Sequence, residues 1–122
     1  MNSRGKGARC EREWTAELRE AGWSKARRGQ QYAGGAESPD VICPELSFIH
    51  WEVKHCERGN PFEFMAQAVS DAGAGKLPVM AFRRNRHPFL VILRAADAFA
   101  LLRNSNLDDV QRECAESARQ TP

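Results

Sequence analysis

The sequence predicts an α/β protein in which a central mixed β-sheet is flanked by helices. Helix-like and strand-like segments alternate along the chain, the strand segments are short apolar runs bounded by proline or glycine, and several helix ends carry capping residues. At 122 residues the chain is long enough for one core but not for two. We therefore expect one domain over 1–122, with a core of about 4–103 and a helical tail over 104–122.

The first element is expected to be a helix, because Cys10, Trp14 and Leu18 recur at helical spacing and Gly22 follows. A second helix start is marked by Asn60 as N-cap and Pro61 at the first helical position. In chain order we expect a helix over 8–21, strands over 23–28, 39–43 and 46–54, a helix over 61–72, strands over 77–82 and 88–93, and helices over 95–103 and 106–118.

The segment 46–54 is the longest strand signal, and its side chains alternate between two faces. Ile49, Trp51 and Val53 form an apolar face that we assign to the core. Glu52 and Lys54 share the opposite face, about 7 Å apart along the strand. His50 lies on the Glu52 face, where we expect a satisfied or exposed strand histidine rather than a ligand.

A turn at 44–45 would form a hairpin that brings Asp40 close to Glu52, with the Lys54 ammonium beside both. Two converging carboxylates repel each other unless a cation lies between them, and oxygen ligands of this kind suit Mg²⁺ or Mn²⁺. The ion would activate a bound water and neutralise phosphate charge, while Lys54 would orient or activate that water. On spacing alone, a surface Glu–Lys pair with an unrelated loop aspartate remains an open alternative.

Basic residues are clustered, although the formal net charge is only +2. Local clusters of this kind can bind phosphates, but solvated loop arginines would give the same pattern. The three clusters are Arg4, Lys6, Arg9 and Arg12; Lys25, Arg27 and Arg28; and Arg83, Arg84 and Arg86.

Other features narrow the class of protein. The four cysteines form no Cys-x-x-Cys pair, so we expect reduced and mostly buried thiols rather than disulfides or a zinc site from 43, 50, 55 and 56. No apolar run reaches the length of a membrane-spanning helix, and the N-terminus lacks a signal-peptide pattern. We therefore expect a cytoplasmic protein that does not bind membranes.

The pattern Pro39-Asp40 followed by Glu52-Val53-Lys54 resembles the PD-(D/E)xK nuclease superfamily, whose core is a restriction-endonuclease-like αβββαβ sheet. The segment 4–13 (RGKGARCERE) is similar to the N-terminal helix of archaeal-type Holliday junction resolvases. The segments 28–31, 39–42 and 78–86 also look like resolvase-like proteins of phages and prophages. The resemblance covers roughly 4–103.

The resemblance implies roles for individual residues. Asp40 and Glu52 match metal-binding carboxylates, the Val53 carbonyl a further ligand, and Lys54 the catalytic lysine. Glu11 matches the helix glutamate that completes the acidic cluster, Arg12 the basic residue near the scissile phosphate, and Gln67 a polar residue beside the site. An exposed helix glutamine is an equal reading of Gln67. The basic clusters and Gln31 of the Gln/Gly loop are the expected DNA contacts, listed in full as Arg4, Lys6, Arg9, Arg12, Arg27, Arg28, Gln31, Arg83, Arg84 and Arg86.

The leading expectation is a Mg²⁺- or Mn²⁺-dependent Holliday junction resolvase that acts as a homodimer, since a four-way junction needs two symmetric cuts. The setting implied by the resemblance is a bacterial or phage-infected cell. Alternatives are a nuclease of the same fold for a flap, nick, end or duplex, and a non-catalytic DNA-binding or nuclease-inhibiting module. An RNA-binding accessory factor has only the arginine clusters in its favour.

Overall fold

A computed structural model describes residues 3–29 and 39–120, with side chains over 7–29 and 39–118. In chain order the elements are α1 (Ser3–Glu20), β1 (Arg27–Arg28), β2 (Val41–Ile42), a 3₁₀ helix (Pro44–Leu46), β3 (Ile49–His55), α2 (Pro61–Ala72), β4 (Leu77–Arg83), β5 (Leu90–Ile92), α3 (Ala95–Arg103) and α4 (Leu107–Gln120).

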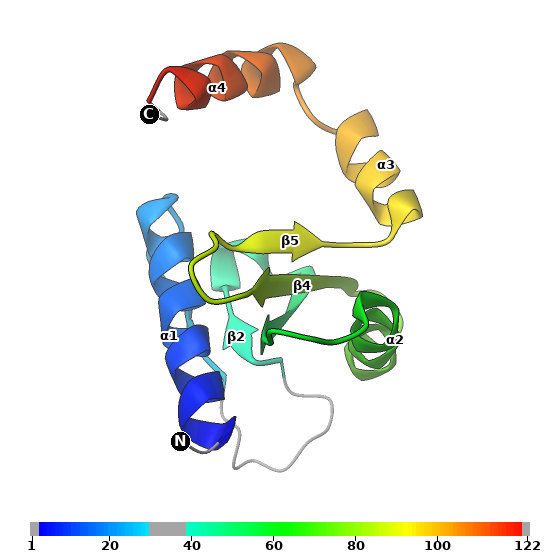
Figure 1. Ribbon diagram of the computed structural model, residues 1–122. Coiled ribbons are helices and arrows are strands. Elements are labelled where there is room, and N and C mark those ends of the chain that lie inside the picture. The colour runs from blue at the N-terminus through cyan, green and yellow to red at the C-terminus, as the bar shows by residue number, and fades with distance from the viewer. Residues whose placement is uncertain (1–2, 30–38, 121–122) are drawn as a thin grey trace.

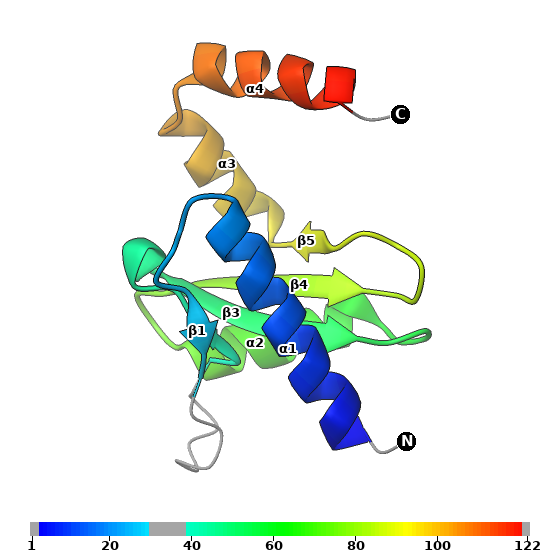
Figure 2. The same ribbon diagram turned by 90° about the vertical axis from the view of Figure 1, so that its left-hand side faces the viewer.

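The described strands form one mixed sheet in the order β1-β2-β3-β4-β5. β3 and β4 are parallel, and the other neighbouring pairs are antiparallel. Parallel neighbours need a crossover, which α2 provides. Figures 1 and 2 show α1 on one face of the sheet and α2 on the other. The predicted α/β class, with a restriction-endonuclease-like αβββαβ order, is therefore confirmed.

The core lies between α1 and the sheet. Trp14 of α1 packs edge-on against Trp51 of β3, with ring centroids 5.3 Å apart, and against Phe89, at 5.0 Å. Val41 and Ala81 are fully buried in the same cluster. The predicted core side of β3 is confirmed, because Trp51 projects into this cluster while Glu52 projects toward α2.

The ends of several elements differ from the prediction. The strand expected over 23–28 is reduced to Arg27–Arg28, because the chain after α1 forms a helix-ending turn in which the Trp23 amide donates to the Leu18 carbonyl at 3.0 Å. Gly22 makes this turn possible with a φ of +119°. The strand expected over 46–54 starts later, at Ile49, because the residues after Cys43 form the 3₁₀ helix.

The C-terminal part forms an arm that leaves the sheet. α3 has the predicted bounds, and α4 begins one residue later than expected and extends further. Both helices stand away from α1 and the sheet (Figures 1 and 2). Their exposed large hydrophobic side chains are Phe99, Leu101, Leu102, Leu107 and Val110. Among the described helices, none has both the length and the apolar character needed to cross a membrane.

Candidate active site

Hydrogen bonds of both its backbone and its side chain hold Asp40 directly before β2. Its amide donates to the Trp51 carbonyl at 3.0 Å, and its carbonyl accepts from the Gly29 amide at 2.9 Å. Its carboxylate oxygen Oδ2 accepts from the Val53 amide at 2.9 Å. The predicted hairpin therefore forms, with Val41 opposite Trp51, and it fixes the Asp40 carboxylate against β3.

Gly29 makes this placement possible. A Cβ atom at residue 29 would overlap the Pro39 carbonyl oxygen, so only glycine allows the chain after β1 to lie this close to Asp40. The sequence signal for this close approach is a glycine directly after the Arg27–Arg28 pair.

Glu52 faces α2 and is mostly buried. Its Oε1 lies 2.8 Å from Nε2 of His50, whose side chain is 4% exposed within the strand. Burial raises the pKa of Glu52 from 4.5 to about 7; the His50 hydrogen bond opposes this rise, whereas the hydrogen bond and negative charge of Asp40 add to it. His50 is thus a satisfied strand histidine, as predicted, and its partner is the candidate ligand itself.

Five of the predicted site residues line one cavity of about 310 Å³ between the sheet and α2. They are Asp40, Glu52, Val53, Lys54 and Gln67. The Lys54 ammonium lies 4.8 Å from the centre of the Phe64 ring, and Gln67 donates to Asp71 at 3.0 Å. Glu63 also lines this cavity. It lies one helical turn before Gln67, a spacing that could have revealed it in the sequence.

Glu11 is buried, at 7% exposed, but it is not among the residues that line this cavity. Its Oε1 accepts from Nε of Arg28 at 3.1 Å and pairs with Nη2 at the same distance. The described part of the chain contains no group of three or more His, Cys, Asp or Glu side chains arranged to hold a metal ion. The structure therefore brings Asp40 and Glu52 together and gives Glu11 a separate basic partner.

The predicted basic residues fall into two groups. Arg9 lies 3.9 Å from Glu13, and Arg83 forms an ion pair with the same glutamate and stacks over Phe89. Arg12, Arg27, Arg84 and Arg86 are exposed. The side chains of Arg4 and Lys6, and all of Gln31, lie outside the described residues.

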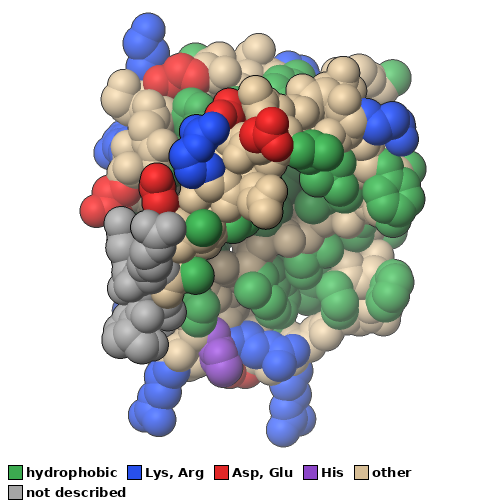
Figure 3. Space-filling model, turned by 90° about the horizontal axis from the view of Figure 1, so that it is seen from above, with side chains coloured by type: hydrophobic (Ala, Val, Ile, Leu, Met, Phe, Trp, Pro, Cys, Tyr) green, Lys and Arg blue, Asp and Glu red, His purple; other side chains and the backbone are tan. Residues whose placement is uncertain are grey.

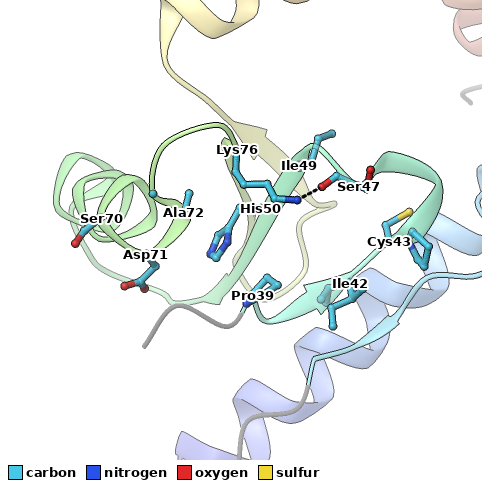
Figure 4. A pocket seen from close by; sticks show the side chains of 13 residues that line it. Pro39, Ile42, Cys43, Ser47, Ile49, His50, Ser70, Asp71, Ala72 and Lys76 are labelled. Carbon is cyan, nitrogen blue, oxygen red and sulfur yellow. Dashed lines mark hydrogen bonds between the residues drawn. The ribbon is translucent and has the colours of Figure 1, made fainter. Parts of the chain in front are cut away.

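A second cavity, of about 480 Å³, is lined by residues of β2, β3 and α2 and of the loops that flank them (Figure 4). His50, Asp71 and Lys76 line it, and the Lys76 ammonium donates to the Ser47 carbonyl at 2.5 Å. Since Gln67 bonds to Asp71 and Glu52 to His50, two hydrogen bonds connect the residues of the two cavities.

The cysteines are free. Cys10 and Cys43 are buried as predicted, and burial raises the pKa of the Cys10 thiol to about 11. Cys56 is half-buried and Cys114 is exposed, so the prediction of mostly buried thiols fits only two of the four. Cys114 is exposed because α4 packs on no core surface.

The donor set fits a hard divalent cation. Two carboxylates of adjacent strands converge beside the Val53 peptide group, and the raised pKa of Glu52 indicates repulsion and desolvation that a cation would offset. A site with so few protein oxygens suits an ion that keeps several waters. A mixed sheet with an aspartate on one strand and Glu-x-Lys on the next defines the class of PD-(D/E)xK nucleases, which use divalent metal ions.

Comparison with protein families gives the particular group. The model of the family described as "Phage putative PDDEXK endonuclease" matches residues 2–120. The chain therefore belongs to this phage PD-(D/E)xK endonuclease family. Comparison with the curated proteins and with the solved structures gave no match.

Proposed function

We propose that this nuclease cuts branched DNA and that its preferred substrate is a four-way junction, with Mg²⁺ or Mn²⁺ as its cofactor. The observation that carries the proposal is the cavity in which Asp40, Glu52 and Lys54 meet. The family supports DNA as the partner and a bacterial or phage-infected cell as the setting. The choice of junctions rests on the resemblance of 4–13 and 78–86 to resolvases.

The residues of this cavity would have different roles in metal binding and catalysis. The Asp40 and Glu52 carboxylates and the Val53 carbonyl would hold the ion, with Asp40 kept in place by the Val53 amide. When bound, the ion supplies a Lewis acid that lowers the pKa of a water and neutralises charge on the phosphate. Lys54 projects its ammonium into the same space and would stabilise the charge that develops on the phosphate oxygens.

Gln67 and Glu11 would act from the helices on either side. Gln67 is oriented by its hydrogen bond to Asp71 and would donate to a water or a phosphate oxygen beside the ion. Glu11 is engaged with Arg28, so it would add an oxygen to the acidic set only if Arg28 moved to a DNA phosphate. Arg12, on the exposed side of α1, would lie near the scissile phosphate.

A homodimer would supply the two symmetric cuts that a junction requires. The C-terminal arm supports this proposal, because Phe99, Leu102 and Leu107 are exposed on helices that cover none of the core. Seen from the side of this arm, hydrophobic side chains lie around a hollow, and charged side chains lie above it and toward the edges (Figure 3). α4 carries four carboxylates and two arginines, so the remainder of the chain is net +4, which favours contact between the arm of one copy and the body of another.

Two other functions compete. A nuclease of the same fold could prefer a flap, a nick, an end or a duplex, and a non-catalytic DNA-binding module would keep the fold without cutting. The presence of Asp40, Glu52 and Lys54 in one cavity favours a catalyst.

The test is a cleavage assay on a synthetic four-way junction beside duplex, flap and single-stranded DNA of the same sequence. Each is incubated with Mg²⁺, with Mn²⁺ or with chelator, and Glu52→Ala serves as the inactive control. Paired symmetric cuts in the junction, abolished by chelator and by the substitution, are expected. Preferential cutting of another substrate would reject the junction, and binding without cutting in either metal would reject the enzyme.

A further inference from the structure

An apolar cavity of about 440 Å³ lies on the α2 side of the sheet, next to the edge strand β5. Phe82 of β4, Leu90 and Ile92 of β5 and Pro61 of α2 form its apolar lining. Arg84 and His87 line it from the β4–β5 loop, and none of its lining residues is a carboxylate. Its volume falls in the range of small-molecule sites, about 300–1,000 Å³.

This cavity lies beside the candidate active site. Phe82 is the register partner of Lys54, and paired strands are about 5 Å apart. The Phe82 ring is 6.4 Å from the Phe64 ring, over which the Lys54 ammonium lies. The first turn of α2 separates the two spaces, and Phe62 on that turn is 83% exposed. DNA that presents a phosphate to Lys54 would therefore lie close enough for a neighbouring nucleotide to reach this cavity.

The basic loop at the rim is held in place. The Asn85 amide donates to Oε1 of Glu57 at 2.8 Å, and the Asn85 side chain bonds to Nε2 of His55 at 2.7 Å. The His87 amide donates to the Arg84 carbonyl at 3.2 Å, which closes the turn. The Arg84 guanidinium lies over the Phe82 ring at 5.7 Å. The loop that carries Arg84 and His87 is thus ordered by its own hydrogen bonds.

We propose that this cavity binds an unpaired nucleobase of the DNA substrate. The apolar surface of Leu90, Ile92 and Pro61 would take the base, and Arg84 and His87 would contact its phosphates. The inference rests on the proposed function and deepens it, since it supplies a way to recognise a branch point by the bases that leave the stack there.

The chemistry of the cavity favours an unpaired base over other occupants. Bases within a duplex present only their polar edges, whereas an unstacked base also presents its faces, which stack on aromatic and apolar side chains. The Arg84 guanidinium and the His87 ring beside an apolar surface suit a ligand that is flat and apolar in the middle and anionic at its edge. An apolar protein segment would offer the Arg84 guanidinium no anionic partner.

The test compares two aspartate substitutions on the same strand. Leu90 lines the cavity and is 60% exposed, whereas its neighbour Val91 projects to the other face of the sheet and is 47% exposed. Leu90→Asp places a carboxylate against the base and its phosphates, and Val91→Asp adds the same charge elsewhere. Binding is measured in chelator with a four-way junction that carries 2-aminopurine at the branch point, and with a duplex of the same sequence.

We expect a rise or fall in 2-aminopurine fluorescence when the unsubstituted protein binds, and the loss of that change with Leu90→Asp. Junction affinity should fall about 5- to 100-fold, the range of one lost base stack, while duplex affinity changes less than twofold. Val91→Asp should behave like the unsubstituted protein. Circular dichroism melting checks that both variants are folded, and Arg84→Ala, which leaves the cavity floor intact, should weaken junction binding in the same direction.

Three results would overturn the inference. Equal effects of Leu90→Asp and Val91→Asp would show that the charge, not the cavity, matters. If Leu90→Asp lowers the affinity for junction and duplex equally, the cavity contacts only phosphates and does not bind an unpaired base. Conversion of a dimer to a monomer by Leu90→Asp alone, measured by sedimentation, would show that a second copy covers the cavity. If the unsubstituted protein cuts DNA in the cleavage assay, each of these leaves the proposed nuclease function in place.

Discussion

Burial, a hydrogen bond and a neighbouring charge all affect the Glu52 carboxyl group. It is buried against α2, bonded to His50 at 2.8 Å and close enough to Asp40 for the two carboxylates to repel. Without a cation the pKa of Glu52 is about 7, so its carboxyl group gains or loses its proton near neutral pH. A bound cation would offset this unfavourable environment of the Glu52 carboxylate, which supports Glu52 as a proposed metal ligand.

This imbalance predicts a pH dependence of stability in the metal-free protein. The folded-state pKa of Glu52 exceeds its unfolded value, so its contribution to the free energy of unfolding is present below about pH 4.5 and is lost as the pH rises through about 7. Glu52→Gln does not titrate. The free energy of unfolding of the Glu52→Gln variant, relative to that of the unsubstituted protein, should therefore rise by about 2–3 kcal/mol between pH 4.5 and pH 8.

The measurement is urea unfolding in chelator at a series of pH values. Asp71→Asn is the matched control, because Asp71 bonds to Gln67 at the border of the site and should not reproduce the effect. A stability difference between Glu52→Gln and the unsubstituted protein that stays constant with pH would contradict the assignment.

Gly29 predicts a second effect at a single residue. Gly29→Ala adds a methyl group where the Pro39 carbonyl lies, so the chain must move and carry Asp40 with it. We expect cleavage to fall at least tenfold, since the carboxylate would leave its hydrogen bond to the Val53 amide. Gly7→Ala is the control, because nothing lies near a Cβ at that helical position and alanine favours helix by about 0.5–1 kcal/mol.

The comparison is made from initial cleavage rates at saturating metal, together with thermal melting. Full activity of Gly29→Ala would mean that Asp40 does not need this placement.

Among the elements, α4 has an apolar side that no other part of the described chain covers. Leu107 and Val110 share one side of an otherwise highly charged helix and would ordinarily be buried. Both are exposed, as are Phe99 and Leu102 of α3. An amphipathic helix with no core to cover is typical of an interaction surface, which is the reason that the proposed dimer is assigned to this arm.

Charging the apolar side of α4 should therefore separate the proposed dimer. We expect the double variant Leu107→Lys and Val110→Lys to be a monomer at micromolar concentration. The melting temperature of this variant should lie within a few degrees of that of the unsubstituted protein when both proteins are measured as monomers. Glu116→Lys, on the opposite side of α4, should leave the dimer intact.

Analytical ultracentrifugation distinguishes the states across a hundredfold range of concentration. If the unsubstituted protein sediments as a monomer throughout that range, the proposed dimer is wrong. If the double variant still forms a dimer, the interface does not include this side of α4.

At the scale of the whole molecule, charge distribution matters more than net charge. The formal net charge is +2, yet α4 carries four carboxylates against two arginines, while exposed arginines lie on α1, β1 and the β4–β5 loop. Non-specific affinity for DNA comes from cations that displace counterions from phosphates. A nearly neutral protein can therefore show the strong salt dependence that is typical of a basic one.

We expect DNA affinity to fall steeply between 50 and 200 mM salt, by about 10³-fold if six phosphates are contacted. Arg12→Ala and Arg86→Ala should each lower the slope of log affinity against log salt by about 1, because each would remove one phosphate contact. Arg103→Ala, at the end of α3, is the control and should leave the slope unchanged.

Fluorescence anisotropy with labelled duplex in chelator gives these slopes. Salt-insensitive binding would contradict the phosphate contacts as a whole, and an unchanged slope in the first two variants would assign the contacts to other arginines.

The elements with local signals could be predicted from the amino-acid sequence alone. Asn60 and Pro61 fixed the start of α2, Trp51 marked the buried side of β3, and the order of helices and strands followed from hydrophobic periodicity. The sequence also placed Glu52 and Lys54 on one side of a strand, since alternation in a strand is a property of the backbone. The family resemblance supplied the chemistry of that side.

Contacts between side chains of different elements could be seen only in the folded structure. It paired His50 with Glu52, brought Glu63 into the cavity and gave Glu11 to Arg28. It also shortened the strand expected at 23–28, because Trp23 completes the turn that ends α1. The physical reason is that these contacts depend on strand register and on the approach of helices to the sheet, which are set by packing across the whole core and not by any local pattern.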